Sequence, residues 1–226
     1  MKNIGMVVAV EIQAVLDRFG DALEELVFPG YTVKKYSTDS YNLYIMHCGA
    51  GEIAASAGVQ FLITKFDVDM VVNFGVVGGL TPEMALAKTC IVEKVVHYDF
   101  DTSMIDNCEV GRYLEYPDVY LPASKEMLEA ALQVDPNLKK VTCASGDKFI
   151  GDSAKKQALH DTYGADICEM EAAGIVLTCN RNKVPCLLIK TVSDSITGGA
   201  EEFSREINRT AALSLDIAIK VMEKMC

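Results

Sequence analysis

The sequence predicts a single α/β domain in three layers, with a central mixed β-sheet flanked by helices on both faces. Apolar strand-like runs alternate with helical runs along all 226 residues, and this alternation is typical of α/β domains. Half of the residues are hydrophobic, which is enough for one large core. No Pro/Ser-rich linker, low-complexity tract or internal repeat interrupts the chain, so residues 1–226 are predicted to form one domain.

In the first half of the chain, residues 3–10 form an apolar run typical of a buried strand. The next segment predicts a helix, because apolar residues recur at helical spacing. They are Ile12, Val15, Leu16, Phe19, Leu23 and Leu26. Residues 31–37 and 41–48 predict a pair of strands joined by a polar turn. A helix of small residues at 53–66 and a short strand at 70–75, ending in glycine, complete this half.

The second half begins with a strand at 88–98 and a long loop rich in Asp, Tyr and Pro at 100–122. A helix follows, and Ser124 is a plausible N-cap for it. The remaining predicted elements are a strand at 139–145, a helix at 153–163, a short strand at 165–169, a helix from 170, a strand at 186–194 and a C-terminal helix from about 201.

Ligands of α/β sheets bind at the carboxyl ends of the strands. The segments at these ends are therefore expected to be loops that gather around one site. They are residues 73–79, 144–152, 167–171 and 191–199.

Composition excludes several classes of partner. The formal net charge is −11, from 21 basic and 32 acidic residues, so nucleic acid and anionic membranes are not expected partners. No apolar stretch is long enough to span a membrane, and the opening residues predict a strand instead of a signal peptide. The eight cysteines include no CxxC pair, which argues against zinc or a dithiol redox site and indicates reduced thiols in a cytoplasmic protein. No metal or cofactor is predicted.

Two glycine-bearing segments are candidate ligand loops. The segment at 49–54 has the GxGxxA spacing of a dinucleotide fingerprint, but the next strand ends at Asn73–Phe74–Gly75, without the acid that would hold a ribose. A plain strand-to-helix turn is the favoured interpretation. The segment at 75–79 can approach a ligand closely, but with Val76, Val77 and no basic residue it is poorly equipped to hold a phosphate.

Three carboxylates are candidates for chemistry. Asp194 ends an apolar strand, where burial would raise its pKa and suit it to general acid work; a cap for the last helix is an equally good alternative. Glu169 and Glu171 open an apolar helix, where residues two apart point to different faces. Glu169 fits a simple helix-dipole role. Glu171 fits that role less well and could accept hydrogen bonds from the hydroxyl pair of a ribose.

Four segments together resemble the nucleoside phosphorylase/nucleosidase superfamily, and most of all its bacterial 5′-methylthioadenosine/S-adenosylhomocysteine nucleosidases. They are residues 73–80, 145–150, 169–172 and 193–194, in the order and at the spacing of that family. The resemblance runs nearly end to end, is thinnest at 100–140, and implies a nucleoside phosphorylase-like fold.

The resemblance also implies roles for individual residues. Asp194 would protonate N7 of an adenine leaving group, Met170 and Glu171 would hold the ribose, Phe149 would stack on the purine and the Ile150 backbone would read its edge. Further substrate-binding positions that it implies are Val76, Gly78, Lys190 and Ser193. A carboxylate beside the ribosyl cation stabilises the transition state more than the ground state.

Water is the acceptor that the resemblance favours. Phosphorolytic relatives have an Arg before the glycine segment, a hydroxyl within it and another Arg near the N-terminus; here these places hold Asn73, Val76 and residues 11–13. The water-activating Glu of the hydrolases aligns with Gln13, which cannot take a proton. Glu11 would serve if the turn is shifted. Lys190 stands where the family has an Arg. It keeps the positive charge but lacks the planar guanidinium that can donate two parallel hydrogen bonds.

The expected protein is a cytoplasmic homodimer that hydrolyses 5′-methylthioadenosine, S-adenosylhomocysteine or both and releases adenine. The resemblance implies that residues 113–122 of a neighbouring subunit complete the pocket for the 5′-substituent. The alternatives are a purine nucleoside phosphorylase, a hydrolase of another nucleoside, or a nucleoside-binding protein with weak turnover, for which Gln13→Glu should raise the rate.

Overall fold

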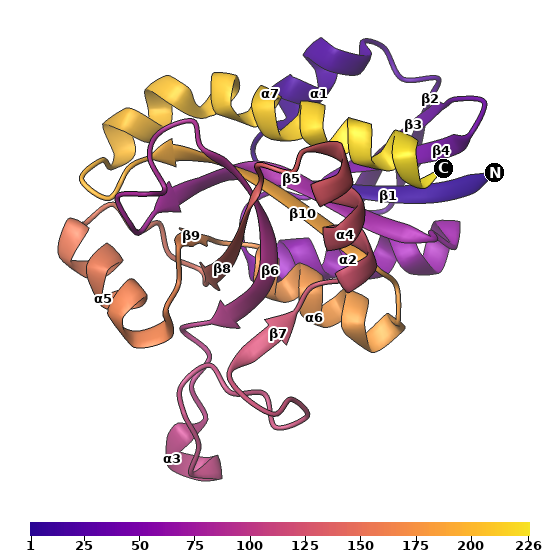
Figure 1. Cartoon of the computed structure of the whole chain (residues 1–226). Coiled ribbons are helices and arrows are strands. Elements are labelled where there is room, and N and C mark those ends of the chain that lie inside the picture. The colour runs from indigo at the N-terminus through magenta and orange to yellow at the C-terminus, as the bar shows by residue number, and fades with distance from the viewer.

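The computed structural model describes residues 1–226, which form one ten-stranded mixed sheet with helices on both faces (Figure 1). The strands are β1 (Lys2–Val8), β2 (Glu24–Phe28), β3 (Tyr31–Ser37), β4 (Tyr41–His47), β5 (Met70–Gly79), β6 (Thr89–His97), β7 (Tyr120–Pro122), β8 (Lys139–Ser145), β9 (Ile167–Glu169) and β10 (Cys186–Asp194). The helices are α1 (Ile12–Phe19), α2 (Glu52–Phe66), α3 (Ser103–Asp106), α4 (Lys125–Val134), α5 (Ser153–Tyr163), α6 (Ala172–Asn182) and α7 (Ala200–Met225).

The sheet closes partly on itself. Its strands follow the order β10-β6-β8-β9-β5-β1-β4-β3-β2, and β10 also pairs with β5, so that five strands form a ring. The pairs β1–β4, β1–β5, β5–β10, β6–β8 and β8–β9 are parallel, whereas β6–β10 and β5–β9 are antiparallel. The predicted mixed sheet is confirmed.

Two helical layers cover the two faces of the sheet, as predicted (Figure 1). Helices α1, α4 and α7 enclose one apolar core with strand residues such as Phe74. Helices α2 and α6 enclose a second core on the opposite face, around residues such as Val59 and Val176. Burial of these side chains is the main stabilising contribution to the fold.

The segment at 98–119 projects away from the body and carries α3 (Figure 1). At its base, the rings of Phe100 and Tyr113 stack with centroids 4.4 Å apart, and the Tyr113 hydroxyl lies 2.8 Å from Nδ1 of His97. The predicted long loop is therefore an ordered arm with a short helix, followed by the edge strand β7.

Two elements differ from their prediction. The first helix ends at Phe19 and does not reach Leu26, because Gly20 follows with φ +66° and residues 24–28 pair with β3 as a hairpin. The strand predicted to end at Gly75 continues to Gly79 because it pairs with β10 as far as Gly78, so residues 73–79 are not a loop. The predicted cap is confirmed, since the Ser124 hydroxyl accepts a bond from the backbone N–H at the start of α4.

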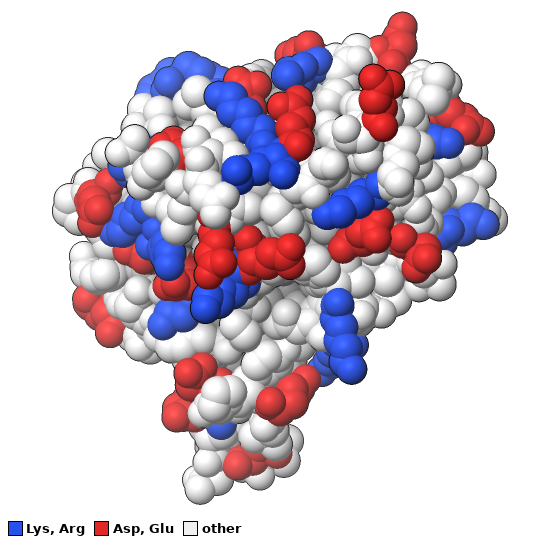
Figure 2. All heavy atoms as spheres, turned by 45° about the vertical axis from the view of Figure 1, so that its right-hand side comes forward, with Lys and Arg blue, Asp and Glu red and all other residues white.

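No helix is both long enough and apolar enough to cross a membrane. On the face shown in Figure 2, Lys and Arg side chains are interspersed with Asp and Glu and form no basic patch.

Candidate active site

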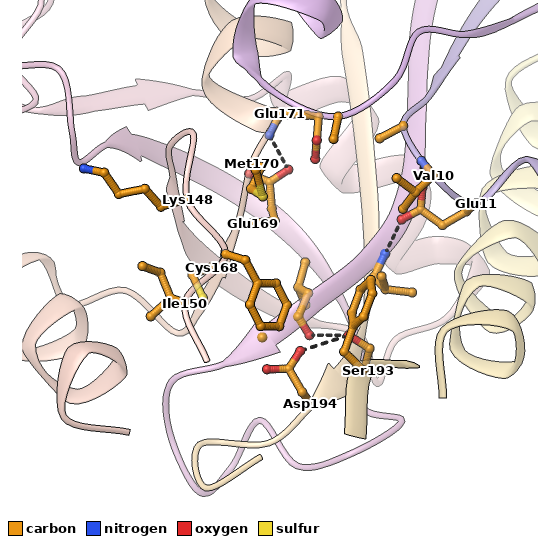
Figure 3. A pocket seen from close by; sticks show the side chains of 17 residues that line it. Val10, Glu11, Lys148, Ile150, Cys168, Glu169, Met170, Glu171, Ser193 and Asp194 are labelled. Atoms are coloured by element: carbon orange, nitrogen blue, oxygen red, sulfur yellow. Dashed lines mark hydrogen bonds between the residues drawn. The ribbon is translucent and has the colours of Figure 1, made fainter. Parts of the chain in front are cut away.

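A pocket opens at the carboxyl ends of the parallel strands, where the sequence placed it. Its lining comes from the segments after β1, β4, β8 and β9, from the second half of β5, from the end of β10 and from the first turn of α7 (Figure 3). Nine of the predicted site residues line it: Glu11, Val76, Gly78, Phe149, Ile150, Met170, Glu171, Ser193 and Asp194. Gln13 and Lys190 do not.

Asp194 ends β10 and is only 1% exposed. Its Oδ2 accepts a hydrogen bond from Nζ of Lys156 at 2.5 Å, and its Oδ1 lies 3.1 Å from the hydroxyl of Ser193. Lys156 extends from α5, is fully buried, and also donates to the carbonyls of Ser195 and Gly198. Asp194 is thus a buried, ion-paired carboxylate at the pocket wall.

The alternative role of Asp194 as a helix cap is wrong. The N-cap of α7 is Gly199, five positions further along the chain, and no side chain caps it. The carboxylate that binds the loop between β10 and α7 is Glu202, which accepts a bond from the backbone N–H of Ser195.

Glu11 occupies the wall opposite the 148–150 segment. It is the N-cap residue of α1 and is 6% exposed. Its Oε1 accepts from the backbone N–H of Val76 at 3.0 Å, and its Oε2 accepts from that of Val10 at 3.0 Å. Placing Gln13 in the site is contradicted by the structure, because its side chain is exposed and donates to Asp17 on the outer face of α1.

Glu169 and Glu171 do not lie on one helix, as the sequence had suggested. Glu169 is the last residue of β9, and its carboxylate accepts from the backbone N–H groups of Glu171 and Ala172. Glu171 is the N-cap residue of α6, and its Oε1 accepts from the N–H of Gly51 at 2.8 Å. Burial, and next the charge of Glu169, raise the pKa of Glu171 to about 7.

Lys190 lies behind the pocket and not in its lining. The residue is 2% exposed, and its ammonium donates to Oε2 of Glu169 at 3.1 Å. Burial acts to lower its pKa, but the charges of Glu169, Glu171 and Glu11 outweigh this effect and raise it above the ordinary value. Its predicted direct contact with substrate is therefore corrected to a contact with Glu169.

The opposite wall of the pocket is apolar and more open. Phe149 is 48% exposed and its ring meets Phe203 of α7 edge-on, with centroids 5.5 Å apart. Ile150 also lines the pocket, whereas Met170 lies beside Glu169 and Glu171 (Figure 3). Such a surface suits the face of a planar, partly apolar ligand.

Sequence reasoning missed several residues of the site, among them Val10, Phe203 and the buried Lys156. Val10 could have been found as the neighbour of Glu11, and Phe203 as an aromatic residue soon after a Gly-Gly pair. Lys156 gave no signal, because it lies in a mostly polar helix next to the exposed Lys155.

The electrostatics of the pocket favour a ligand that becomes positive. Glu11, Glu171 and Asp194 approach it from three sides, and the only cation in the lining, Lys148, points away from them (Figure 3). The Lys148 ammonium lies 3.5 Å from Asp99. A bound phosphate would be repelled by three carboxylates and would meet no Arg.

A buried acid and two further carboxylates that meet at one pocket of an α/β fold are typical of enzymes with acid–base chemistry. A family model described as the Phosphorylase superfamily matches residues 4–225. The chain therefore belongs to the phosphorylase superfamily.

Individual relatives agree with this assignment. An aminodeoxyfutalosine nucleosidase of Campylobacter jejuni is 27% identical over 200 residues, 86% of each chain. A 5′-methylthioadenosine/S-adenosylhomocysteine nucleosidase of a Shewanella species is 31% identical over 160 residues, 68% of each chain. A structure of a futalosine hydrolase mutant of Helicobacter pylori superposes with a TM-score of 0.92 at 23% identity, over 99% of this chain and 100% of that one. These sequence relatives place the chain among the nucleosidases, which are hydrolases of N-glycosidic bonds.

Proposed function

We propose that the protein hydrolyses the N-glycosidic bond of 5′-methylthioadenosine, S-adenosylhomocysteine or both, and releases adenine. One observation carries this proposal: Glu11, Glu171 and Asp194 converge on a single pocket that has no set of anion ligands. The Shewanella relative, whose name states both substrates, supports it.

In this mechanism Asp194 first takes up a proton from water and then delivers it to N7 of the adenine, so that the base leaves as a neutral molecule and Asp194 returns to its ion-paired carboxylate form. Ser193 orients the acid through Oδ1, and Lys156 holds Oδ2. Because the proton reaches the base as the glycosidic bond breaks, the acid contributes only in the transition state.

Glu171 binds the ribose hydroxyls, and its negative charge stabilises the oxocarbenium-like sugar. Met170 contacts the same sugar. Phe149 stacks on the adenine, and the backbone of Ile150 reads its edge. Gly78 of β5 leaves room for the carboxylate of Asp194, since a Cβ there would lie 3.3 Å from its Oδ2.

Glu11 activates the attacking water. Its two oxygens are fixed by the backbone N–H groups of Val10 and Val76. Residue 76 therefore holds Glu11 through its backbone, and its side chain need not carry a hydroxyl group. Lys190 supports this half of the site only from behind, through Glu169. The negative charge of the carboxylates around the pocket favours water over phosphate as the acceptor.

A futalosine-type nucleoside is the second candidate substrate. The observation that favours it is the Campylobacter jejuni aminodeoxyfutalosine nucleosidase, which matches over 86% of both chains. The two candidates share the base and ribose half of the site and differ in the 5′-substituent, which would lie toward the open side of the pocket.

The deciding experiment measures base release from methylthioadenosine, S-adenosylhomocysteine, aminodeoxyfutalosine and inosine, each with and without phosphate. Adenine and a free sugar, at a rate independent of phosphate, are the expected products. A phosphate-dependent sugar phosphate would mean a phosphorylase. Tight binding without base release would indicate a nucleoside-binding protein, and turnover of aminodeoxyfutalosine alone would make it the substrate.

We further propose a cytoplasmic homodimer that serves methionine salvage, in which the arm at 98–119 packs against the partner. Met104, Ile105 and Leu114 on this arm are 96%, 87% and 63% exposed, an apolar surface of the kind that protein interfaces cover. The eight cysteines are all free, as expected for a reducing compartment.

The arm predicts the effect of a single charge on assembly. Ile105→Asp should shift the protein from dimer to monomer in sedimentation velocity, because a carboxylate would be buried at the interface. Val27→Asp, at a 76%-exposed position on the edge strand β2, is the control and should remain dimeric. A dimer that survives Ile105→Asp would place the interface elsewhere.

A further inference from the structure

Glu52 is a buried carboxyl that the mechanism above does not use. It is the first residue of α2, is 6% exposed and does not line the catalytic pocket. Its Oε2 accepts from the backbone N–H of Gly174 at 2.5 Å, and its Oε1 contacts the hydroxyl of Ser145. A Cβ on Gly174 would lie 2.9 Å from Oε2, so glycine there permits the close approach of α2 to α6.

The hydrogens around Ser145 cannot satisfy two ionised carboxylates. Its hydroxyl contacts Oε1 of Glu52, lies 2.6 Å from Oε1 of Glu169 and accepts from the N–H of Ala173 at 3.1 Å. A hydroxyl has one hydrogen to donate. If both carboxyls were ionised, one of the two short oxygen–oxygen contacts would contain no proton and would be repulsive.

The donors present show which carboxyl carries the extra proton. Glu169 accepts from the N–H of Ala172 and from the ammonium of Lys190, both of which stabilise an anion. Glu52 accepts from only one N–H, that of Gly174, and has no cationic partner. The proton therefore belongs on Glu52.

We propose that Glu52 is held as a neutral carboxylic acid that donates its proton to Ser145, and that this chain of hydrogen bonds positions Glu171 for ribose binding. In the chain, Glu52 donates to Ser145 and Ser145 donates to the Glu169 carboxylate. Every hydrogen then has an acceptor. Glu52 is a positioning residue, and its role in ribose binding rests on the proposed nucleosidase function.

The other groups around Glu52 also disfavour its negative charge. The acidic and titratable side chains on the neighbouring elements are Glu169, Glu171, Asp147, Tyr98, His97 and Tyr113. Lys190 is the nearby cation, and it is bound to Glu169. Burial, and next the charge of Glu169, raise the pKa of Glu52 to about 8. The N-terminus of α6 favours an anion, but burial outweighs this effect.

The chain acts on the site through the first turn of α6. Each of the first three backbone N–H groups of this helix has its own side-chain acceptor. The pairs are Ala172 with Glu169, Ala173 with Ser145 and Gly174 with Glu52. Glu171 immediately precedes them, and it is also held by Gly51, the neighbour of Glu52. With Glu52 ionised, Ser145 could donate to only one of Glu52 and Glu169. The other contact would be repulsive and would displace the turn that holds Glu171.

Infrared spectroscopy of the free protein tests the protonation state without any substrate. The wild type should show the carbonyl stretch of a protonated carboxylic acid at neutral pH, and Glu52→Gln should lose that component. Glu169→Gln and Glu171→Gln are matched variants that identify the contributions of the other two carboxyls. A spectrum that Glu52→Gln leaves unchanged, or a component that only Glu169→Gln removes, would overturn the proposal.

Kinetics of the nucleosidase test the positioning role. The wild-type KM should rise about tenfold as Glu52 ionises between about pH 7 and about pH 10, with a smaller change in kcat. Glu52→Gln, whose amide can donate to Ser145 and accept from Gly174, should keep the neutral KM within about threefold and lose the rise. A wild-type pH profile in Glu52→Gln would overturn the positioning role. Failure of the nucleosidase function itself would leave the infrared result intact.

Discussion

At the scale of single residues, the site depends on where each carboxylate is held. Asp194 is fixed between Ser193 and Lys156, on a different side of the pocket from Glu11 and Glu171 (Figure 3). No other group in the lining is placed to deliver a proton to the base on that wall. Its removal should therefore affect the departure of the base and not the binding of the nucleoside.

Asp194→Asn should lower the rate of base release by about 10²- to 10⁴-fold, because an amide cannot supply the proton. Binding of the nucleoside, measured by calorimetry, should change little. Ser193→Ala is the matched control and should cost less than about tenfold, since it removes only an orienting bond. Near-normal release by Asp194→Asn would disprove the leaving-group mechanism.

Glu11 and Gln13 provide a second pair of variants. Glu11→Gln should lower hydrolysis by about 10²-fold or more, because the amide cannot accept the proton of the water. Gln13→Glu should leave the rate unchanged, since that side chain lies outside the pocket. A rise in rate with Gln13→Glu would show that the first turn of α1 rearranges when substrate binds.

These residues also mark the limit of sequence reasoning. That Asp194, Glu171 and Phe149 line one pocket could be predicted, because their spacing within each motif is fixed by one strand or turn. Glu11 and Gln13 could not be distinguished, because a shift of the turn after β1 changes which of them faces the pocket. Lys190 is three positions before Ser193 in the same buried strand, but its ammonium is bound to Glu169 and not to the pocket, which the local sequence does not indicate.

At the scale of elements, strands buried on both faces were predicted well and junctions less well. The long apolar runs of β1 and β10 leave little choice of structure. The hairpin of β2 was misread as helix, since Leu23 and Leu26 also match the helical period. Nothing in the local sequence indicates that β5 continues through two glycines, because its partners β9 and β10 are distant in the chain.

The junction of α5 with β10 depends on one buried ion pair. Lys156→Met should lower the free energy of unfolding by about 3–5 kcal/mol, because it leaves the Asp194 carboxylate buried without its cation. The neighbouring Lys155→Met, on the exposed face of the same helix, should change it by less than about 0.5 kcal/mol. Urea unfolding measures both. Equal stability of the two variants would mean that the pair contributes no net stability.

At the scale of the whole molecule, the three-layer order was predictable from alternation, but the partial closure of the sheet was not. Closure depends on β10 pairing with both β5 and β6, which are far apart in sequence from it. It is this closure that brings the ends of β5, β9 and β10 together, and so brings Glu171 and Asp194 to one pocket. Closure also places several buried acids in one region, and the protonation of these acids contributes to the stability of the whole fold.

Stability should fall as the pH rises through the range in which these acids lose their protons. Glu52 and Glu171 have folded pKa values of about 8 and about 7 against an ordinary value of 4.5. Between these values the folded state holds protons that the unfolded state has released, so their contribution is complete below about pH 4.5 and is lost as the pH rises toward 8. Each such proton gives a slope of about 1.4 kcal/mol per pH unit.

Urea unfolding between about pH 5 and about pH 8 measures this slope. Glu52→Gln should reduce this slope by about 1.4 kcal/mol per pH unit, because glutamine does not titrate. Glu126→Gln removes the same formal charge at an exposed position, so it controls for the repulsion within a chain of net charge −11. If both variants have the wild-type slope, Glu52 has no raised pKa in the folded protein. If both flatten it equally, the slope comes from overall charge and not from the buried acids.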